Sequence, residues 1–177
     1  MQEELKRFIP ALVFVGKFVA LYVVGNLFYG WMVESFSPQP DPMTEWVTVQ
    51  TAQLLSFTGY PSVARISSAA PTVVIDWSGN DILEVYEGCN GLNVMIIFLA
   101  FMIAVGPYVK KIYWFVAGGL LLIHVLNLAR IWGLFLVAVH LPAQFYFVHK
   151  YLFTGILYVV IFLLWLWWFS ISGLKKA

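Results

Sequence analysis

The sequence predicts an all-α integral membrane protein built around a bundle of four transmembrane helices. Hydrophobic residues make up 62% of the 177 residues and charged residues only 11%, and the mean hydropathy is +0.85. A soluble domain carries about 25% charged and about 45–50% apolar residues, so the composition excludes a water-soluble globule. It also excludes a disordered chain, which requires low hydrophobicity.

Four apolar stretches are long enough to cross a hydrocarbon core of about 30 Å, which takes about 20 helical residues. The predicted spans cover residues 8–31, 91–109, 112–139 and 151–171. The first contains Lys17, which we expect to extend toward the nearer membrane surface. This stretch is longer than the apolar part of a signal peptide, about 7–15 residues, and Glu34-Ser35-Phe36 is a poor cleavage site. We therefore expect a retained anchor.

Basic pairs predict the orientation, because such pairs lie on the cytoplasmic side of a membrane. Three of them flank the spans: Lys6/Arg7, Lys110/Lys111 and Lys175/Lys176. With four spans, all three fall on one side. Residues 34–88 then lie outside, and they carry seven of the nine acidic residues against one basic residue. Residues 1–177 are thus predicted to form one integral domain of the inner membrane, with both termini in the cytoplasm.

The extracytoplasmic loop region, residues 34–88, is predicted to hold an interfacial helix and a short hairpin. Asp41-Pro42 is typical of an N-cap followed by proline at the first helical position, and the helix to Phe57 mixes apolar and polar residues as a membrane-surface helix does. Residues 72–77 and 82–86 are predicted strands, joined by the turn sequence Ser78-Gly79-Asn80-Asp81.

Three reactive side chains are predicted to share one level near the outer rim of the membrane. At 1.5 Å of rise per residue, Cys89 lies about 31 Å before Lys110, and Arg130 lies about 28 Å after Lys111. His149 lies about 28 Å before Trp168, which belongs to a tryptophan belt that marks the inner side of the last span.

Two interpretations of Cys89 are possible. A lone cysteine in an apolar chain is usually an inert small hydrophobe. The context Glu87-Gly88-Cys89-Asn90-Gly91 favours a reactive thiol, because the start of a helix lowers the pKa of a thiol and glycines let a substrate backbone approach closely.

Arg130 is the stronger indication of function. An arginine at the centre of a span costs about 2.5–3.5 kcal/mol, and less near a rim. The alternative is a side chain that reaches the headgroups. Asn127 lies on the same helical face, three residues earlier, where its side chain can hold the guanidinium or contact a substrate backbone.

Of the three histidines, His149 ranks first because it shares the level of Cys89 and Arg130. His140 is predicted to lie beyond the rim and stays an alternative, and His124 is predicted to be a core histidine bonded to a neighbour. Because the three lie at three heights, no metal site is expected. A net charge of +1 gives no indication of nucleic-acid binding, and no cofactor is expected. The single cysteine excludes an intrachain disulfide and a cysteine-based zinc site.

A cysteine, a histidine and an arginine at one level suit acyl transfer. The thiolate attacks a peptide carbonyl and the imidazole protonates the departing amine. The guanidinium stabilises the oxyanion, and water or an amine then resolves the thioester.

Glu87-Gly88-Cys89-Asn90-Gly91, Asn127-Leu128-Ala129-Arg130 and His149 together resemble the exosortase/archaeosortase family of membrane cysteine transpeptidases. The chain has fewer spans than typical members and is similar to the compact exosortases of Bacteroidetes. The resemblance implies that Cys89 is the nucleophile, Arg130 the oxyanion stabiliser and His149 the acid/base. Support for the substrate or the oxyanion is expected from Gly88, Asn90 and Asn127.

By the same resemblance, the partners are exported proteins with a C-terminal tail composed of a short motif, a transmembrane helix and a basic cluster. Cleavage then takes place on the extracytoplasmic face, next to membrane lipid. The substrate motif, the acceptor and the oligomeric state stay open. The competing hypothesis is a non-catalytic four-helix scaffold subunit, in which Arg130 pairs with an intramembrane acid of another protein. No broken helix pair or internal repeat indicates a transporter.

Overall fold

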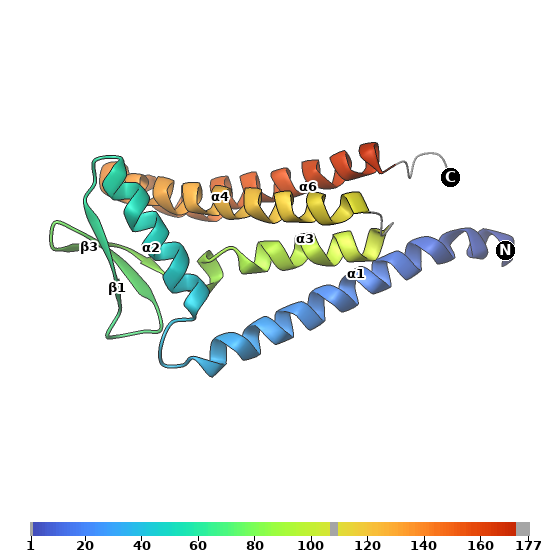
Figure 1. The fold of residues 1–177 in the computed structure, drawn as a ribbon, viewed down its shortest axis with the longest axis horizontal. Helices are drawn as coiled ribbons and strands as arrows, with labels where there is room; N and C mark the ends of the chain where they lie inside the picture. The colour runs from blue at the N-terminus through green and yellow to red at the C-terminus, as the bar shows by residue number, and fades with distance from the viewer. Residues whose placement is uncertain (1, 107–109, 173–177) are drawn as a thin grey trace.

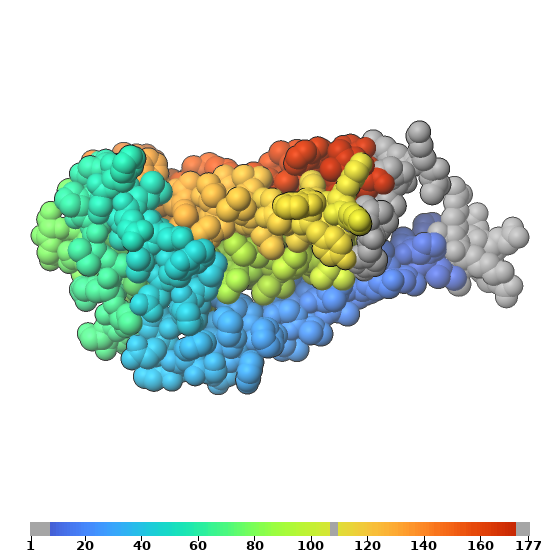
Figure 2. All heavy atoms as spheres, in the orientation of Figure 1, coloured from blue at the N-terminus to red at the C-terminus, as the bar shows by residue number. Residues whose placement is uncertain are grey.

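The computed structural model describes residues 2–106 and 110–172, and the side chains of residues 8–106 and 110–172 within them. Long helices form a bundle, and a smaller unit of one helix and a three-stranded sheet covers one end of it (Figures 1 and 2). The four principal bundle helices are α1 (Gln2–Ser35), α3 (Leu92–Val105), α4 (Lys110–His140) and α6 (Thr154–Ile171).

Three helical segments are long and apolar enough to cross a membrane: Phe8–Ser35, Lys110–His140 and Pro142–Ile171. The last of these is α6 together with the three short helical turns before it, η2 (Pro142–Gln144), α5 (Phe145–Phe147) and η3 (Val148–Phe153). The chain is therefore a multi-pass membrane protein. The predicted first, third and fourth spans fall within these segments.

The second predicted span differs from the structure. The helix there, α3, has 14 residues, which gives about 21 Å of rise, less than the hydrocarbon thickness. It ends at Gly106, whose φ of +59° stops the helix, and Pro107, Tyr108 and Val109 lie outside the described residues. α3 nevertheless runs alongside the other bundle helices: α1 begins, α3 ends and α4 begins at the same end of the bundle (Figure 1).

Of the basic pairs used for orientation, Lys110/Lys111 begin α4 at that same end. Lys175/Lys176 lie outside the described residues, as do the side chains of Lys6 and Arg7. The sidedness of the protein therefore stays a prediction.

The unit at the other end comprises α2 (Pro42–Phe57) and strands β1 (Ser62–Ile66), β2 (Val73–Trp77) and β3 (Asn80–Val85). Asp41 caps α2 by accepting hydrogen bonds from the backbone N–H groups of Met43 and Thr44, both at 3.0 Å. The sheet is antiparallel, in the order β1-β2-β3. The predicted hairpin is β2–β3, and β1 is an additional strand that the sequence prediction omitted.

This unit packs onto α4 through a shared apolar core. Val47 and Leu55 of α2, Ile75 and Val85 of the sheet, and Ile131 and Phe135 of α4 are fully or almost fully buried in it. Cys89 belongs to the same core. The packing of α2 and the sheet against α4 therefore fixes the position of the thiol.

Candidate active site

The Cys89 backbone is fixed by a tight turn between the sheet and α3. After β3, residues Glu87–Cys89 form the 3-10 turn η1, in which the Cys89 N–H donates to the Tyr86 carbonyl at 2.8 Å. Gly91 then takes a φ of +88° at the N-cap of α3, a conformation that favours glycine. A Cβ on Gly91 would lie 3.1 Å from the Asn127 side chain. Glycine is thus needed both for the turn and for the close approach of α4.

Asn90 and Asn127 hold this turn and are both fully buried. The Asn127 amide donates to the Cys89 carbonyl at 3.0 Å. The Asn90 amide donates to the Tyr29 hydroxyl at 3.0 Å and to the Thr44 hydroxyl at 3.1 Å, and its oxygen accepts from the Leu92 N–H at 2.9 Å. Asn90 therefore joins α1 and α2 to the start of α3.

Neither asparagine is among the residues that line the cavity beside Cys89, and the support for the substrate or the oxyanion expected from the sequence stays a prediction. Both are better described as positioning residues. Rise along a helix gives the level of a side chain but not the neighbour at which it points.

The structure brings Cys89, Arg130 and His149 together. The Cys89 Sγ lies 3.8 Å from His149 Nε2 and 3.9 Å from Arg130 Nη2. Arg130 Nη2 lies 3.5 Å from His149 Nε2. Because a guanidinium only donates hydrogen bonds, Nε2 accepts from it in the neutral tautomer that carries its proton on Nδ1. In that tautomer, Nε2 can also take the thiol proton.

His149 is carried by an irregular segment of helix. It lies in η3, a π-helix, and π-helical turns inside helices are frequent at functional sites. Its ring stacks on Phe145 at 5.8 Å between centroids, and the Thr154 hydroxyl donates to its backbone carbonyl at 3.2 Å. These contacts fix the direction in which the imidazole points.

Arg130 is a buried cation with 8% of its surface exposed. Among the side chains that the structure describes, the single ion pair is Arg65–Asp81, so Arg130 has no carboxylate partner there, and its Nε has no hydrogen-bond partner. A buried charge is costly unless it is paired. The groups beside it are the Cys89 thiol and His149, so a thiolate or an oxyanion at this place would supply the missing negative charge.

The pKa of the Cys89 thiol is raised, which corrects the sequence expectation of a lowered value. Burial is the largest cause, and the positive charge of Arg130 and a hydrogen bond with Tyr86 act in the opposite direction. Cys89 is 6% exposed. It also lies three residues before Leu92, the first residue of α3, and the Leu92 N–H donates to the Asn90 side chain, so this N–H is not available to the sulfur.

Tyr86 is a site residue that the sequence analysis missed. Its side chain hydrogen-bonds with the Cys89 side chain and is 44% exposed in the adjoining cavity. A Cβ on Gly88 would collide with the Tyr86 ring, so Gly88 leaves room for the tyrosine. The sequence feature that could have indicated Tyr86 is its position at the end of a predicted strand, three residues before the cysteine.

Tyr86→Phe is expected to move thiol alkylation of Cys89 to higher pH. The Tyr86 hydrogen bond lowers the pKa of the thiol, so its loss reduces the thiolate fraction at any pH below that pKa. The measurement is the alkylation rate of the purified protein against pH. Tyr146→Phe is the matched control, because Tyr146 lines the same cavity but accepts from Lys150 at 2.6 Å. Equal pH profiles for Tyr86→Phe and the unchanged protein would contradict this role.

The cavity beside these residues has a volume of about 330 Å³ and lies between η1, α3, α4 and the η3–α6 segment. Two cations, Arg130 and Lys150, and several hydrogen-bonding side chains line it together with the apolar residues Val94 and Leu157. Its lining residues include Tyr86, Gly88, Arg130, His149, Lys150 and Tyr158. A peptide segment placed in it meets Arg130 and His149 together.

The other two histidines lie apart from this group. His140 Nε2 is 2.8 Å from the Tyr60 hydroxyl. His124 Nε2 is 2.8 Å from Gln50 Oε1, and its ring stacks on Trp46, as expected for a histidine bonded to a neighbour. Within residues 2–106 and 110–172, no group of three or more His, Cys, Asp or Glu side chains is arranged to hold a metal ion.

Comparison with known families gives one informative result. A family model described as transmembrane exosortase (Exosortase_EpsH) matches residues 7–168. No curated protein and no solved structure matches the chain. The matched region includes the η1 turn, Arg130 and His149, and it covers nearly the whole bundle.

Proposed function

The chain belongs to the transmembrane exosortase family, and on that premise we propose that it cleaves the C-terminal sorting tail of exported proteins through a thioester on Cys89. The single observation that carries this proposal is the mutual approach of Cys89, Arg130 and His149 within 3.5–3.9 Å. Family membership by itself supports the coarser description, a membrane transpeptidase of protein sorting.

In the proposed reaction the Cys89 proton moves to His149 Nε2, and the thiolate attacks the scissile carbonyl carbon. The carbonyl π-bond electrons move to oxygen, and the Arg130 guanidinium binds the oxyanion. When the oxyanion re-forms the carbonyl, the C–N bond breaks and His149 gives its proton to the leaving amine. The acyl group is left on sulfur, and water or an amine attacks it in the second half.

The raised pKa of Cys89 is consistent with this sequence of steps. A buried neutral thiol needs a base to remove its proton, and His149 Nε2 lies 3.8 Å away. The thiolate formed lies beside Arg130, whose positive charge lowers the pKa of Cys89. Arg130 therefore serves the thiolate first and the oxyanion next.

We further propose that all four bundle helices cross the membrane, with the termini in the cytoplasm and the site on the extracytoplasmic face. α3 is short, but it lies along α1 and α4, and it ends at the end of the bundle where α4 begins (Figure 1). The basic pair Lys110/Lys111 at the opposite end from Cys89 supports this orientation.

The scaffold alternative is less well supported by the position of Arg130. That hypothesis needs the guanidinium on the outside of the bundle, where it can reach an acid of another protein. Arg130 is instead only 8% exposed, and its guanidinium points at Cys89 and His149 of its own chain.

The two candidate histidines provide the test. His149→Ala is expected to slow cleavage of a co-expressed tail-bearing exported protein by about 10²-fold or more, because general acid–base catalysis contributes about 10²–10⁴-fold. His140→Ala, which removes a hydrogen bond to Tyr60, is expected to leave cleavage close to that of the unchanged enzyme. The readout is the ratio of cleaved to uncleaved substrate in isolated membranes. The reverse ranking would refute the role assigned to His149.

A further inference from the structure

A second cavity lies at the end of the bundle away from Cys89. Its volume is about 440 Å³, and it is bounded by α1, α3 and α6. The α3 residues that line it, Ala104 and Val105, are the last of that helix, whereas Cys89 lies just before the first. All lining residues but one are apolar: Pro10, Val13, Phe14, Ala104, Val105 and Phe169. The exception is Lys17.

Lys17 is an unpaired cation within an apolar helix. It lies in the candidate span Phe8–Ser35, and within the part of the chain whose side chains are described it makes no ion pair. Charged residues within membrane helices are usually paired or bind a ligand. An amine at the edge of an otherwise apolar slot suits an amphiphile with a negatively charged head and a hydrocarbon chain.

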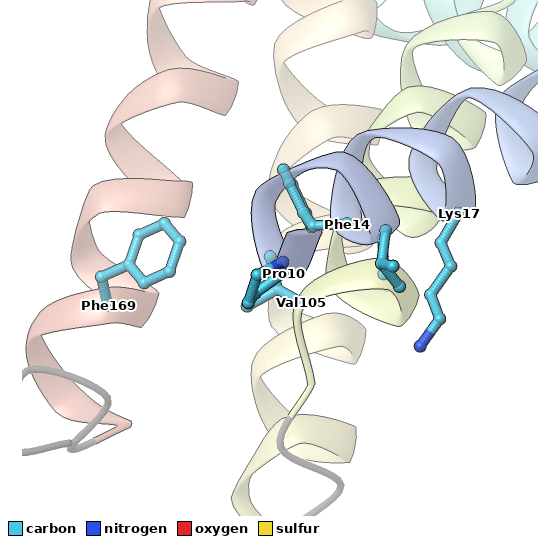
Figure 3. Close-up of a pocket in the computed structure, with 7 residues that line it drawn as sticks. Pro10, Phe14, Lys17, Val105 and Phe169 are labelled. Carbon is cyan, nitrogen blue, oxygen red and sulfur yellow. The ribbon is translucent and has the colours of Figure 1, made fainter. Parts of the chain in front are cut away.

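The depth of the slot fits a lipid headgroup near Lys17. Figure 3 shows the Lys17 side chain extending toward the end of the bundle where α3 and α6 end. Trp167, near the end of α6, is 57% exposed, and interfacial tryptophans mark the headgroup level. The Lys17 amine thus points toward the headgroups, while Phe14 and Phe169 lie beside the slot (Figure 3).

We propose that this cavity binds one phospholipid of the surrounding membrane, with the phosphate on Lys17 Nζ and an acyl chain in the apolar slot. A helix from a second copy of the chain fits the charge less well, because no Asp or Glu follows Glu87 in the sequence. The nearest acids along α1, Glu4 and Glu34, lie about 20 Å or more from Lys17 by helical rise. A lipid phosphate supplies the charge at the right level.

A lipid bound in this cavity would contact both α1 and α6 and would stabilise the packing of α1 against the bundle. α1 is the most exposed helix of the bundle: none of its 18-residue apolar window is buried, and it packs mainly along α3. At its other end the Tyr29 hydroxyl donates to the Glu87 carbonyl at 2.7 Å, in the turn that carries Cys89. The lipid therefore holds the helix whose far end contacts the turn with the nucleophile.

The test is native mass spectrometry of the full chain carrying Cys89→Ala, which separates lipid binding from catalysis. Phosphatidylglycerol is expected to be retained as a one-to-one adduct, whereas a diacylglycerol with the same acyl chains is not. Lys17→Gln is expected to lower the phosphatidylglycerol occupancy about fivefold, the loss of one cation–phosphate contact. Ala104→Phe fills the slot with the charge intact and is expected to lower it as well. Lys111→Gln, which removes a cation at the same end outside the cavity, is the matched control.

Four results would overturn the proposal, and the first three come from the variants and the diacylglycerol. They are unchanged occupancy in both Lys17→Gln and Ala104→Phe, an equal loss in Lys111→Gln, and equal retention of the diacylglycerol. Displacement of the lipid by inorganic phosphate at the same concentration would identify a free-anion site instead and would also overturn it.

Discussion

Replacing Cys89 with alanine is expected to abolish cleavage of tail-bearing exported proteins, a loss of about 10⁴-fold or more, as when the nucleophile is removed from other acyl-transfer enzymes. No other cysteine exists in the sequence to take its place. Cys89 is a small residue in the core between α2, the sheet and α4, so alanine fits the same space. The measurement is substrate processing in membranes that contain equal amounts of the two proteins.

Cys89→Ser is the control for this substitution. Serine keeps the size and a hydrogen-bonding group, but its hydroxyl ionises far less readily than a thiol, so we expect it to be inactive as well. Substrate processing at the normal rate in Cys89→Ala would show that Cys89 is not the nucleophile.

Arg130→Lys is expected to reduce kcat/KM by about 10²–10³-fold, the usual cost of losing one oxyanion donor. The charge is kept, but the planar fork is lost. Arg130 Nη2 approaches both the Cys89 sulfur and His149 Nε2, at 3.9 and 3.5 Å, and a single ammonium on a shorter, flexible stem does not reproduce that arrangement.

The same preparation of Arg130→Lys also gives the control, because thiol alkylation of Cys89 reports whether the thiol is still accessible and the protein folded. Alkylation near the normal rate together with lost cleavage supports a role in the oxyanion step. Normal cleavage in Arg130→Lys would show that a positive charge at this place is sufficient.

The long helices and the cap of α2 could be predicted because their signals are local. Apolar length predicts the spans, and Asp41-Pro42 predicts the start of α2, where Asp41 accepts two backbone hydrogen bonds. β1 was missed because Val63 and Ile66 are 64% and 43% exposed, so the strand carries only a weak apolar alternation. The early end of α3 was missed although Gly106-Pro107 is a sequence signal for the end of a helix, and Gly106 has a positive φ in the structure.

Helical rise alone placed Cys89, Arg130 and His149 at one level, and the structure brings them into contact. What rise cannot give is direction around the helix axis. The sequence therefore did not show that the Asn127 amide donates to the Cys89 carbonyl, or that the Asn90 amide donates to Tyr29 of α1 and Thr44 of α2. The raised pKa of Cys89 likewise depends on burial in a core that includes α2 and α4, which are distant in sequence from Cys89.

In the proposed reaction, the Cys89 sulfur carries an acyl group between the two halves of the reaction. The most direct measurement is intact-mass analysis of the full-length enzyme, quenched with acid shortly after mixing with a tail-bearing substrate, followed by mapping of the modified peptide. We expect a thioester adduct on Cys89 whose mass equals that of the substrate portion before the cleaved bond. Cleaved product in the absence of any Cys89 adduct, across quench times and variants, would contradict it.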